Sequence, residues 1–330
     1  MLNQDLKLNE QMFNEDVEKV ATRVGYGEGL VALGGTNPNV VVLSADLTES
    51  VKADKFAEKF PERFFEMGVA EQNMAAVAAG LGVTGKTAFI SSYATFSPGK
   101  NLETLRTTTV YNDADVKIAG HHAGLMTGPD GATHQATEDL AIVRSWPKMR
   151  VIVPCDAHQA AKATMFSGNK YGPFYLRFTR DNTPIMTTVD TPFEFGKAQV
   201  FWVSENPQAT IFATGYMLFH ALTAAKDLEE EGISTKVVNI HTIKPLDEET
   251  IIGLAKETGA LVSVEDHQVD GGLGSAIAEV LAKNHPTPQE FIGLQNTFGE
   301  SGKIDELLTK YKMDKESIKD AIRKVISRKA

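Results

Sequence analysis

The chain of 330 residues is 42% hydrophobic and 23% charged, an ordinary globular composition with room for about two domains. Its net charge of -10 argues against nucleic acid or an anionic membrane as the main partner, because both require a basic surface. The single cysteine, Cys155, excludes an intramolecular disulfide. The polar start MLNQDLKLNE lacks the apolar core of a signal peptide, and no apolar run approaches the ~20 residues of a membrane span, so we expect a cytoplasmic protein.

Short apolar runs alternate with segments of helical spacing through the first half of the chain. Each run predicts a strand, and the runs occupy residues 39–46, 63–68, 86–93, 116–122, 150–154 and 173–179. Because strands that alternate with helices pair in parallel, this pattern predicts an α/β fold in which helices cover both faces of a parallel sheet.

The alternation stops at residues 181–199, where two prolines interrupt a segment without helical period. We expect a linker here and place the boundary near residue 190, with a first domain at residues 1–187 and a smaller α/β domain at residues 188–330. Further strands are predicted in the second domain at 209–215, 234–240 and 260–266.

Ligands of open parallel sheets bind beyond the carboxyl ends of the strands, so polar residues that follow the strands are candidates. Glu71, which opens the helix QNMAAVAAGLG, is most simply a first-turn acid favoured by the helix dipole by about 0.3–1 kcal/mol. The Ala and Gly content of that helix instead predicts that both its faces are closely packed. Glu71 would then be buried, where a carboxylate can share a proton with a ring nitrogen. The other candidates at strand ends are Asp46, Tyr93, His121, His122 and Arg180.

Tyr93 and Phe96 stand three residues apart at a strand-to-helix junction. Two core aromatics are the simplest interpretation of this pair. Close to Glu71, however, the two rings could hold a flat heteroaromatic ring by offset stacking, and such a ring is what a lone carboxylate would need as a partner.

A Gly-rich loop, GHHAGLMTGPDGATHQATEDL, carries His121, His122, Asp130 and His134. Their spacing matches no zinc signature, so we predict no metal site on this chain. Imidazoles and an acid on a loop are better suited to proton transfer and to hydrogen bonds with a hydroxylated substrate.

Four polar residues in separate segments could together clamp a phosphate dianion, because forked guanidinium donors and a hydroxyl suit that ion. They are Arg23, Ser50, His122 and Arg180, and their spacing alone does not show that they meet. In the second domain, the GGLG segment lacks the order of a phosphate-binding loop, and we expect it to shape an interface.

Read together, these segments resemble thiamine diphosphate enzymes of the transketolase family, specifically the C-terminal section of transketolase that occurs as a separate subunit. The motifs occur in the family's order over nearly the whole chain: ATR, LSADLTES, GVAEQNM, SSYATF, HHAGLMTGPDGATHQ and RFTRDN. The resemblance implies a pyrimidine-binding domain followed by the family's smaller C-terminal domain.

The resemblance also implies thiamine diphosphate as the cofactor. Glu71 matches the glutamate that hydrogen-bonds N1′ of the aminopyrimidine and favours the imino tautomer, from which the thiazolium ylid forms. Tyr93 and Phe96 match the aromatic wall around that ring, and Asp46 matches an acid near it and near the subunit interface. A third aromatic of some members is replaced by Gly99, so that part of the wall is open or filled by another residue.

For the substrate, His134 matches the catalytic histidine that binds the donor's oxygens, and Asp130 matches the acid that reads the acceptor's 2-hydroxyl. The four clamp residues match, one by one, the positions that hold the sugar phosphate. The implied activity is transfer of a two-carbon ketol (glycolaldehyde) unit from a ketose phosphate to an aldose phosphate.

The family binds the diphosphate through a divalent metal that a Gly-Asp-Gly motif holds on another domain. This sequence contains no Gly-Asp-Gly. The resemblance therefore implies a separate N-terminal subunit that holds Mg²⁺ (or Ca²⁺), together with self-association in an α2β2 assembly.

Several alternatives remain open. The TIKPLD and EDHQVDGGLG segments also resemble 1-deoxyxylulose-5-phosphate synthase and the β subunits of 2-oxo acid dehydrogenases, and an unusual branched sugar phosphate could be the substrate. A non-catalytic docking protein is disfavoured because Glu71, Asp130 and His134 are all present.

Overall fold

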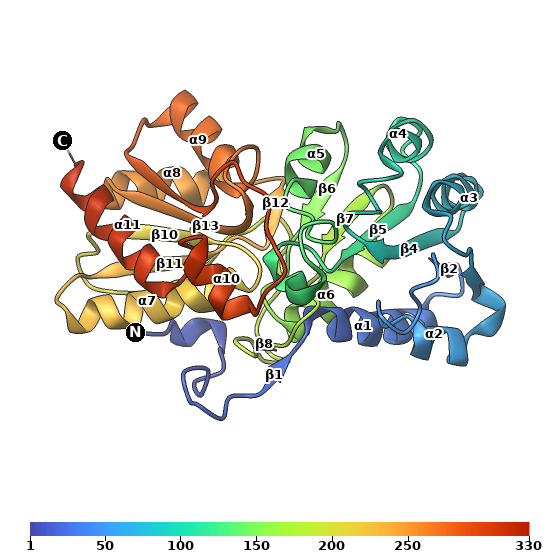
Figure 1. Ribbon diagram of the computed structural model, residues 1–330, viewed down its shortest axis with the longest axis horizontal. Helices are drawn as coiled ribbons and strands as arrows, with labels where there is room; N and C mark the ends of the chain where they lie inside the picture. Colours follow the sequence, from blue (N-terminus) through green and yellow to red (C-terminus); the bar gives the residue numbers. More distant parts are fainter. Residues whose placement is uncertain (330) are drawn as a thin grey trace.

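The six strands predicted in the first half join one further strand in a seven-stranded sheet in the computed structural model, which describes residues 1–329 (Figure 1). The strand order is β12-β6-β7-β5-β4-β2-β3, and all neighbours are parallel except β12, which runs antiparallel to β6. The strands are β2 (Val40–Ser44), β3 (Phe64–Glu66), β4 (Thr87–Tyr93), β5 (Val116–His121), β6 (Arg150–Ile152), β7 (Phe174–Arg177) and β12 (Thr242–Lys244).

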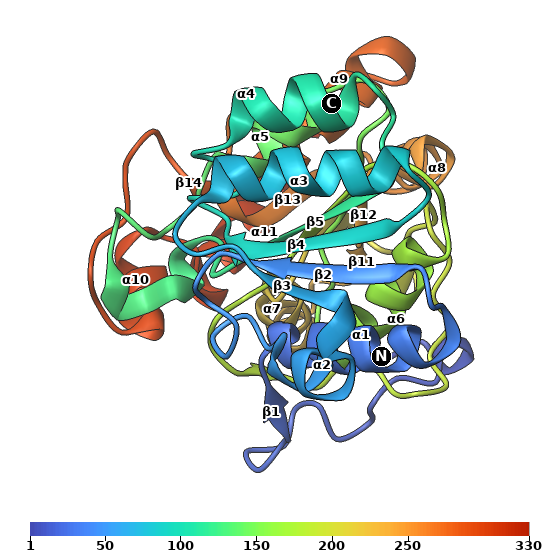
Figure 2. The ribbon, with the colours of Figure 1, turned by 90° about the vertical axis from the view of Figure 1, so that its right-hand side faces the viewer.

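Helices cover both faces of this sheet, which confirms the predicted α/β class (Figure 2). One face carries α1 (Thr22–Thr36), α2 (Asp54–Lys59) and α6 (Ala157–Gly168), and the other carries α3 (Glu71–Val83), α4 (Leu102–Thr104), its π-helical continuation (Leu105–Val110) and α5 (Asp139–Ser145). The α1 and α6 helices pack closely because α1 is rich in glycine. A Cβ on Gly25 would lie 1.9 Å from the carbonyl oxygen of Ala157, so only glycine fits there.

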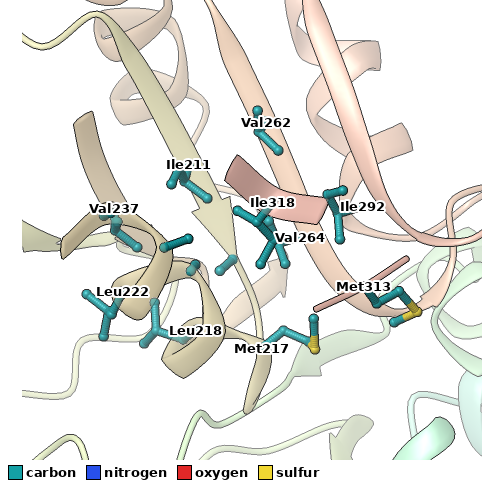
Figure 3. Packing of buried hydrophobic residues seen from close by; sticks show 14 of the residues in the cluster. Ile211, Met217, Leu218, Leu222, Val237, Val262, Val264, Ile292, Met313 and Ile318 are labelled. Atoms are coloured by element: carbon teal, nitrogen blue, oxygen red, sulfur yellow. The ribbon is translucent and has the colours of Figure 1, made fainter. Parts of the chain in front are cut away.

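A five-stranded sheet of order β14-β13-β10-β11-β9 forms the smaller second part, and only β9 is antiparallel. One face of this sheet is apolar, and Ile211 and Val262 pack there with Ile318, as Figure 3 shows. The elements are β9 (Gln199–Trp202), β10 (Ala209–Ala213), α7 (Met217–Glu230), β11 (Thr235–Asn239), α8 (Glu248–Thr258), β13 (Leu261–Gln268), α9 (Leu273–Asn284), β14 (Gln289–Leu294), α10 (Ile304–Lys310) and α11 (Lys315–Ser327).

Three short pairings near the junction of the two parts were not predicted from the sequence, and two of them tie the parts together. The strand β12 lies within the second part of the chain yet extends the first sheet. The segment expected as a linker contains β8 (Thr183–Pro184), which pairs with β1 (Lys19–Val20). Near the N-terminus, the backbone N–H of Asn3 donates to the carbonyl of Phe201. Strands of two or three residues carry too little hydrophobic pattern to be recognised before their partners are known.

Apolar packing is also continuous between the two parts. One buried cluster runs from the α3 face of the first sheet, through Val153 and Ile240, to the α8 and α9 face of the second sheet. Across residues 1–329, the structure contains no helix that is both long enough and apolar enough to cross a membrane.

Candidate active site

The carboxyl ends of the parallel strands β2, β4, β5 and β7 lie at one edge of the first sheet. In the register of that sheet, Tyr93 at the end of β4 pairs with His121 at the end of β5. The residues just beyond these ends therefore meet, although they are far apart in the sequence.

Four rings gather at this edge. Tyr93 stacks on His122, with ring centroids 3.8 Å apart and an interplanar angle of 22°. It also stacks on Phe96 at 5.8 Å, and the His134 ring meets Phe96 edge-on at 5.5 Å. The two predicted aromatics thus lie beside two of the three loop imidazoles.

The predicted phosphate-binding residues are linked by hydrogen bonds to this ring cluster. The hydroxyl oxygens of Ser50 and Tyr93 lie 2.9 Å apart, and His122 Nε2 lies 3.4 Å from Ser50 Oγ. Arg23 Nη1 donates to the backbone carbonyl of Ser50 at 2.6 Å. Three of the four clamp residues therefore meet around Ser50, which spacing alone did not show.

Arg180, the fourth clamp residue, joins this group from the end of β7. Its Nη1 donates to the carbonyl of Thr127 at 3.1 Å, and its Nη2 lies 3.7 Å from a carboxylate oxygen of Asp130. The guanidinium therefore connects the clamp to the loop that carries Asp130 and His134.

The electrostatics of the cluster favour an anion. Burial lowers the pKa of His122 to about 3, and the positive charges of Arg23 and Arg180 act in the same direction. Burial and the neighbouring Arg180 also lower the pKa of Arg23. Among residues 1–329, Arg23 Nε and His122 Nδ1 are buried without a hydrogen-bond partner. Two cations that repel each other and two unused polar atoms are best satisfied by a negatively charged ligand.

Glu71 begins α3 and is 2% exposed. Lys100 Nζ donates to its Oε2 at 2.7 Å, and the side chain of Asn101 donates to its backbone carbonyl at 3.1 Å. The segment that follows Phe96 therefore anchors Glu71 through Lys100 and Asn101. Lys100 was not among the predicted residues, although a lone cation four residues after Phe96 was a usable signal.

The expectation that both faces of α3 are closely packed is wrong for this chain. Ala76, Val77 and Gly80 are exposed, and no atom lies within 4 Å of a Cβ built on Gly80. One face of α3 packs on the sheet, through Met74 and Ala78. The other face of α3 is exposed, and its small side chains give it a flat surface.

Asp46 lies at the exposed end of β2, with φ at +59°, and does not touch the ring cluster. Its backbone N–H donates at 2.7 Å to Glu66, which also accepts from Thr48 Oγ1 and from the backbone of Gly68. Glu66 therefore ties the loop after β2 to the turn that leads into Glu71. It was not among the predicted residues, although it too ends a strand.

Two further sequence candidates have structural explanations. His121 is fully buried between Tyr26 and Phe178, whereas His122 lies one residue beyond β5, where the backbone has a positive φ of 51° and the ring stacks on Tyr93. At Gly99, a Cβ would fall 2.0 Å from the carbonyl of Thr95, so this backbone leaves no room for a third aromatic.

The residues present suit a flat, positively polarised ring together with an anionic group. Glu71 offers a buried carboxylate, of which Lys100 engages one oxygen, and Tyr93 and Phe96 offer ring faces. No group of three or more His, Cys, Asp or Glu side chains within residues 1–329 has the geometry to hold a metal ion. An α/β protein with such an edge belongs to the class of cofactor-binding enzymes.

Comparison with known proteins narrows this class. Residues 18–186 match the transketolase pyrimidine-binding domain, and residues 196–318 match the transketolase C-terminal domain. The chain is 45% identical over 299 residues to a protein of Methanocaldococcus jannaschii provisionally named a transketolase C-terminal section, and the match covers 90% of this chain and 93% of that one.

Two further relatives have more specific names. A 6-deoxy-6-sulfo-D-fructose transketolase subunit of a Clostridium species is 35% identical, and the match covers 97% of this chain and 98% of the relative. One of the subunits of the apulose-4-phosphate transketolase of Phocaeicola vulgatus is 34% identical, with 91% of this chain and 95% of the relative covered.

A solved structure of a split-gene transketolase, described as an inactive β4 tetramer, superposes with a TM-score of 0.88 at 44% identity. The match covers 94% of this chain and all of that chain. The chain belongs to the transketolase family, whose members depend on thiamine diphosphate, and it corresponds to the C-terminal section. The family resemblance stated from the sequence motifs is thereby confirmed.

Proposed function

We propose that this chain is the C-terminal subunit of a split transketolase and transfers a two-carbon ketol unit from a ketose phosphate to an aldose phosphate. The observation that carries the proposal is the joint presence, at one sheet edge, of a buried carboxylate, two stacked rings and a cationic cluster. The names of the relatives, which include transketolase subunits of nearly the same length, support it.

In this proposal Glu71 holds a proton at N1′ of the cofactor's aminopyrimidine, and Tyr93 and Phe96 pack on that ring. Asp46 is assigned to the rim of the cofactor site, near the partner subunit. Thiamine diphosphate, when bound, supplies the electron sink that makes cleavage of a carbon–carbon bond next to a carbonyl possible. The buried position of Glu71 favours this role, because a desolvated carboxylate bonds strongly to a ring N–H.

For the substrate, we assign the phosphate to Arg23, Ser50, His122 and Arg180. His134 binds and exchanges protons with the oxygens of the donor sugar, and Asp130 reads the acceptor's hydroxyl. Because His122 is neutral at pH 7, the positive charge of the clamp comes from Arg23 and Arg180, whose forked guanidinium donors suit the anionic oxygens of a sugar phosphate.

The metal and the diphosphate-binding residues would come from an N-terminal subunit, in an α2β2 assembly. The exposed flat face of α3, beside Glu71, is the surface we assign to that subunit. The name of the structural neighbour, an inactive β4 tetramer of a split transketolase, is consistent with a chain that self-associates and lacks activity by itself.

The test is a ketol-transfer assay with xylulose 5-phosphate and ribose 5-phosphate in the presence of thiamine diphosphate and Mg²⁺. The chain is assayed alone and mixed with a transketolase N-terminal subunit from the same source. We expect turnover only in the mixture. If neither sample turns over these sugars, a second mixture with pyruvate and glyceraldehyde 3-phosphate distinguishes a synthase-like activity from a wrong assignment.

A further inference from the structure

The loop of residues 122–136, here called the substrate loop, carries His122, Asp130 and His134 but contains little regular structure. A short 3-10 helix (Leu125–Asp130) is its main element, and positive φ angles at Gly124, Gly128 and Gly131 bend its backbone. A loop of this kind needs contacts from outside to keep its side chains in one arrangement.

The first end of the substrate loop is held by a carboxylate from the other part of the molecule. Asp266, in β13 of the second sheet, is 2% exposed. Its Oδ1 accepts from the backbone N–H of Leu125 at 2.8 Å, and its Oδ2 accepts from the N–H of Met126 at 3.3 Å. A Cβ on Gly124 would lie 2.0 Å from Oδ2, so glycine is required for the carboxylate to come this close.

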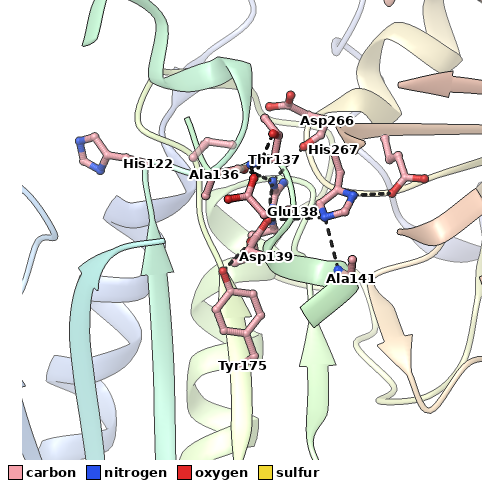
Figure 4. Close-up of polar contacts among 12 residues, drawn as sticks. His122, Ala136, Thr137, Glu138, Asp139, Ala141, Tyr175, Asp266 and His267 are labelled. Carbon is pink, nitrogen blue, oxygen red and sulfur yellow. Dashed lines mark hydrogen bonds and ion pairs between the residues drawn. The ribbon is translucent and has the colours of Figure 1, made fainter. Parts of the chain in front are cut away.

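The second end is held by Arg177 of β7 together with residues of β13. Arg177 forms an ion pair with Asp139 and donates to the carbonyls of Ala136 and Asp266, at 3.1 and 2.9 Å. The backbone N–H of Gln268 donates to the carbonyl of Thr137 at 2.8 Å. Figure 4 shows this group of polar contacts at the junction of the two parts. Asp266 and Gln268 of β13 therefore contact the chain at the start of the substrate loop and next to its end.

The side chains on either side of Asp266 in β13, those of Glu265 and His267, bond to other segments. Glu265 accepts from the backbone N–H groups of Leu273 and Gly274, which begin α9. His267 accepts from the N–H of Ala141 at 3.4 Å and donates to the carbonyl of Gln268 at 2.7 Å. Neither side chain touches the substrate loop, so only the Asp266 carboxylate of these three bonds to it.

We propose that Asp266 is a positioning residue of the active site: its carboxylate, from the second part of the chain, fixes the start of the substrate loop and thereby the places of His122, Asp130 and His134. The EDHQ segment then serves the site and not only the core of its own sheet. This inference rests on the proposed function for its kinetic consequence, but not for its structural one.

The structural test is hydrogen–deuterium exchange on the full chain, comparing D266N with E265Q. The two substitutions are matched, because each replaces a buried carboxylate that accepts from two backbone N–H groups by an amide that can accept at only one of its two positions. We expect exchange in the peptides that contain Leu125 and Met126 to be about 10-fold faster in D266N and unchanged in E265Q. The peptide that contains Leu273 and Gly274 should show the reverse.

Equal protection of the substrate loop in D266N and in the unsubstituted chain would overturn the proposal. If D266N does not fold, G124A offers the same test from the loop side, since its Cβ would push the carboxylate away. Equal loop protection in G124A would likewise overturn the proposal.

The kinetic test uses the chain reconstituted with its N-terminal subunit. We expect D266N to raise the KM for the sugar phosphates about 10-fold and to weaken thiamine diphosphate binding much less, because Glu71 is held by Lys100 and Asn101 outside the loop. A merely structural role would change cofactor affinity and KM together. If the reconstituted unsubstituted enzyme transfers no ketol unit, the proposed function fails, while the exchange comparison still decides the role of Asp266 in the loop.

Discussion

The two sheets carry charged residues at the ends of their strands, but they use them differently. At the end of β13, the carboxylates of Glu265 and Asp266 each accept from two backbone N–H groups, and burial keeps His267 neutral beside them. At the edge of the first sheet, Arg23 Nε and His122 Nδ1 have no partner among residues 1–329. Charge at a strand end therefore does not by itself mark a ligand site, because the buried carboxylates of the second sheet are paired within the chain.

The largest loss of activity should come from substitution of Glu71, which is proposed to bond to the cofactor. E71Q should lower ketol transfer in the reconstituted enzyme by about 10²–10⁴-fold, because an amide cannot hold the proton as a carboxylate does. The circular dichroism spectrum and melting temperature should change little. E58Q, in the exposed face of α2, is the control for loss of one surface charge. Near-normal turnover in E71Q would break the assignment of the first sheet edge as the active site.

In the second sheet, the buried carboxyl of Glu265 should affect the free energy of unfolding rather than the activity. Burial raises the pKa of Glu265 from 4.5 to about 7. Between those two pH values the folded chain keeps a proton that the unfolded chain has lost, so this carboxyl contributes stability at low pH that disappears as the pH rises to 7. E265Q does not titrate, so its unfolding free energy relative to the unsubstituted chain should rise by about 3 kcal/mol from pH 4.5 to pH 7.5. Urea unfolding that gives the same difference in free energy between E265Q and the unsubstituted chain at both pH values would contradict this.

The clamp offers a third test, of intermediate size. R180A removes a guanidinium that would bond to the substrate's anionic group, and it should raise the KM for sugar phosphates by about 10–100-fold. The sugar without its phosphate is the matched control, and its KM should be unchanged. An equal rise for both sugars would show that Arg180 acts only through its bonds to Thr127 and Asp130.

The smallest effect concerns the link between the rings and the clamp. Y93F removes the hydroxyl that lies 2.9 Å from Ser50 Oγ but keeps the ring that stacks on His122. The loss of one neutral hydrogen bond, about 0.5–1.5 kcal/mol, should raise the KM for sugar phosphates about 2–10-fold and leave cofactor affinity unchanged. A loss of cofactor affinity instead would show that the hydroxyl orders the cofactor side of the cluster.

Much of the fold could be predicted from the sequence because the strands of the first sheet are long apolar runs between helical segments. The runs at 86–93 and 116–122 became β4 and β5 with boundaries within one residue. The short strands β1, β8 and β12 could not be predicted, because each pairs with a segment more than 80 residues away. Their partners, and not their own composition, make them strands.

Several candidate site residues could be named from the sequence, but the geometry that brings some of them together could not. Residues at strand ends, such as Tyr93 and Arg180, follow from the rule for parallel sheets, and the family motifs named the rest. The meeting of Arg23, Ser50 and His122 required the register of the sheet and a positive φ at His122. Lys100 and Glu66 were missed because they bond to site residues instead of forming a motif of their own.

The most direct test of the central claim is the position of thiamine diphosphate and a sugar phosphate in a crystal structure of this chain with its N-terminal subunit. The account predicts that Glu71 lies within hydrogen-bond distance of N1′ of the pyrimidine, and that the phosphate lies among Arg23, Ser50, His122 and Arg180. A cofactor ring bound away from Glu71, or a phosphate outside this group, would contradict it.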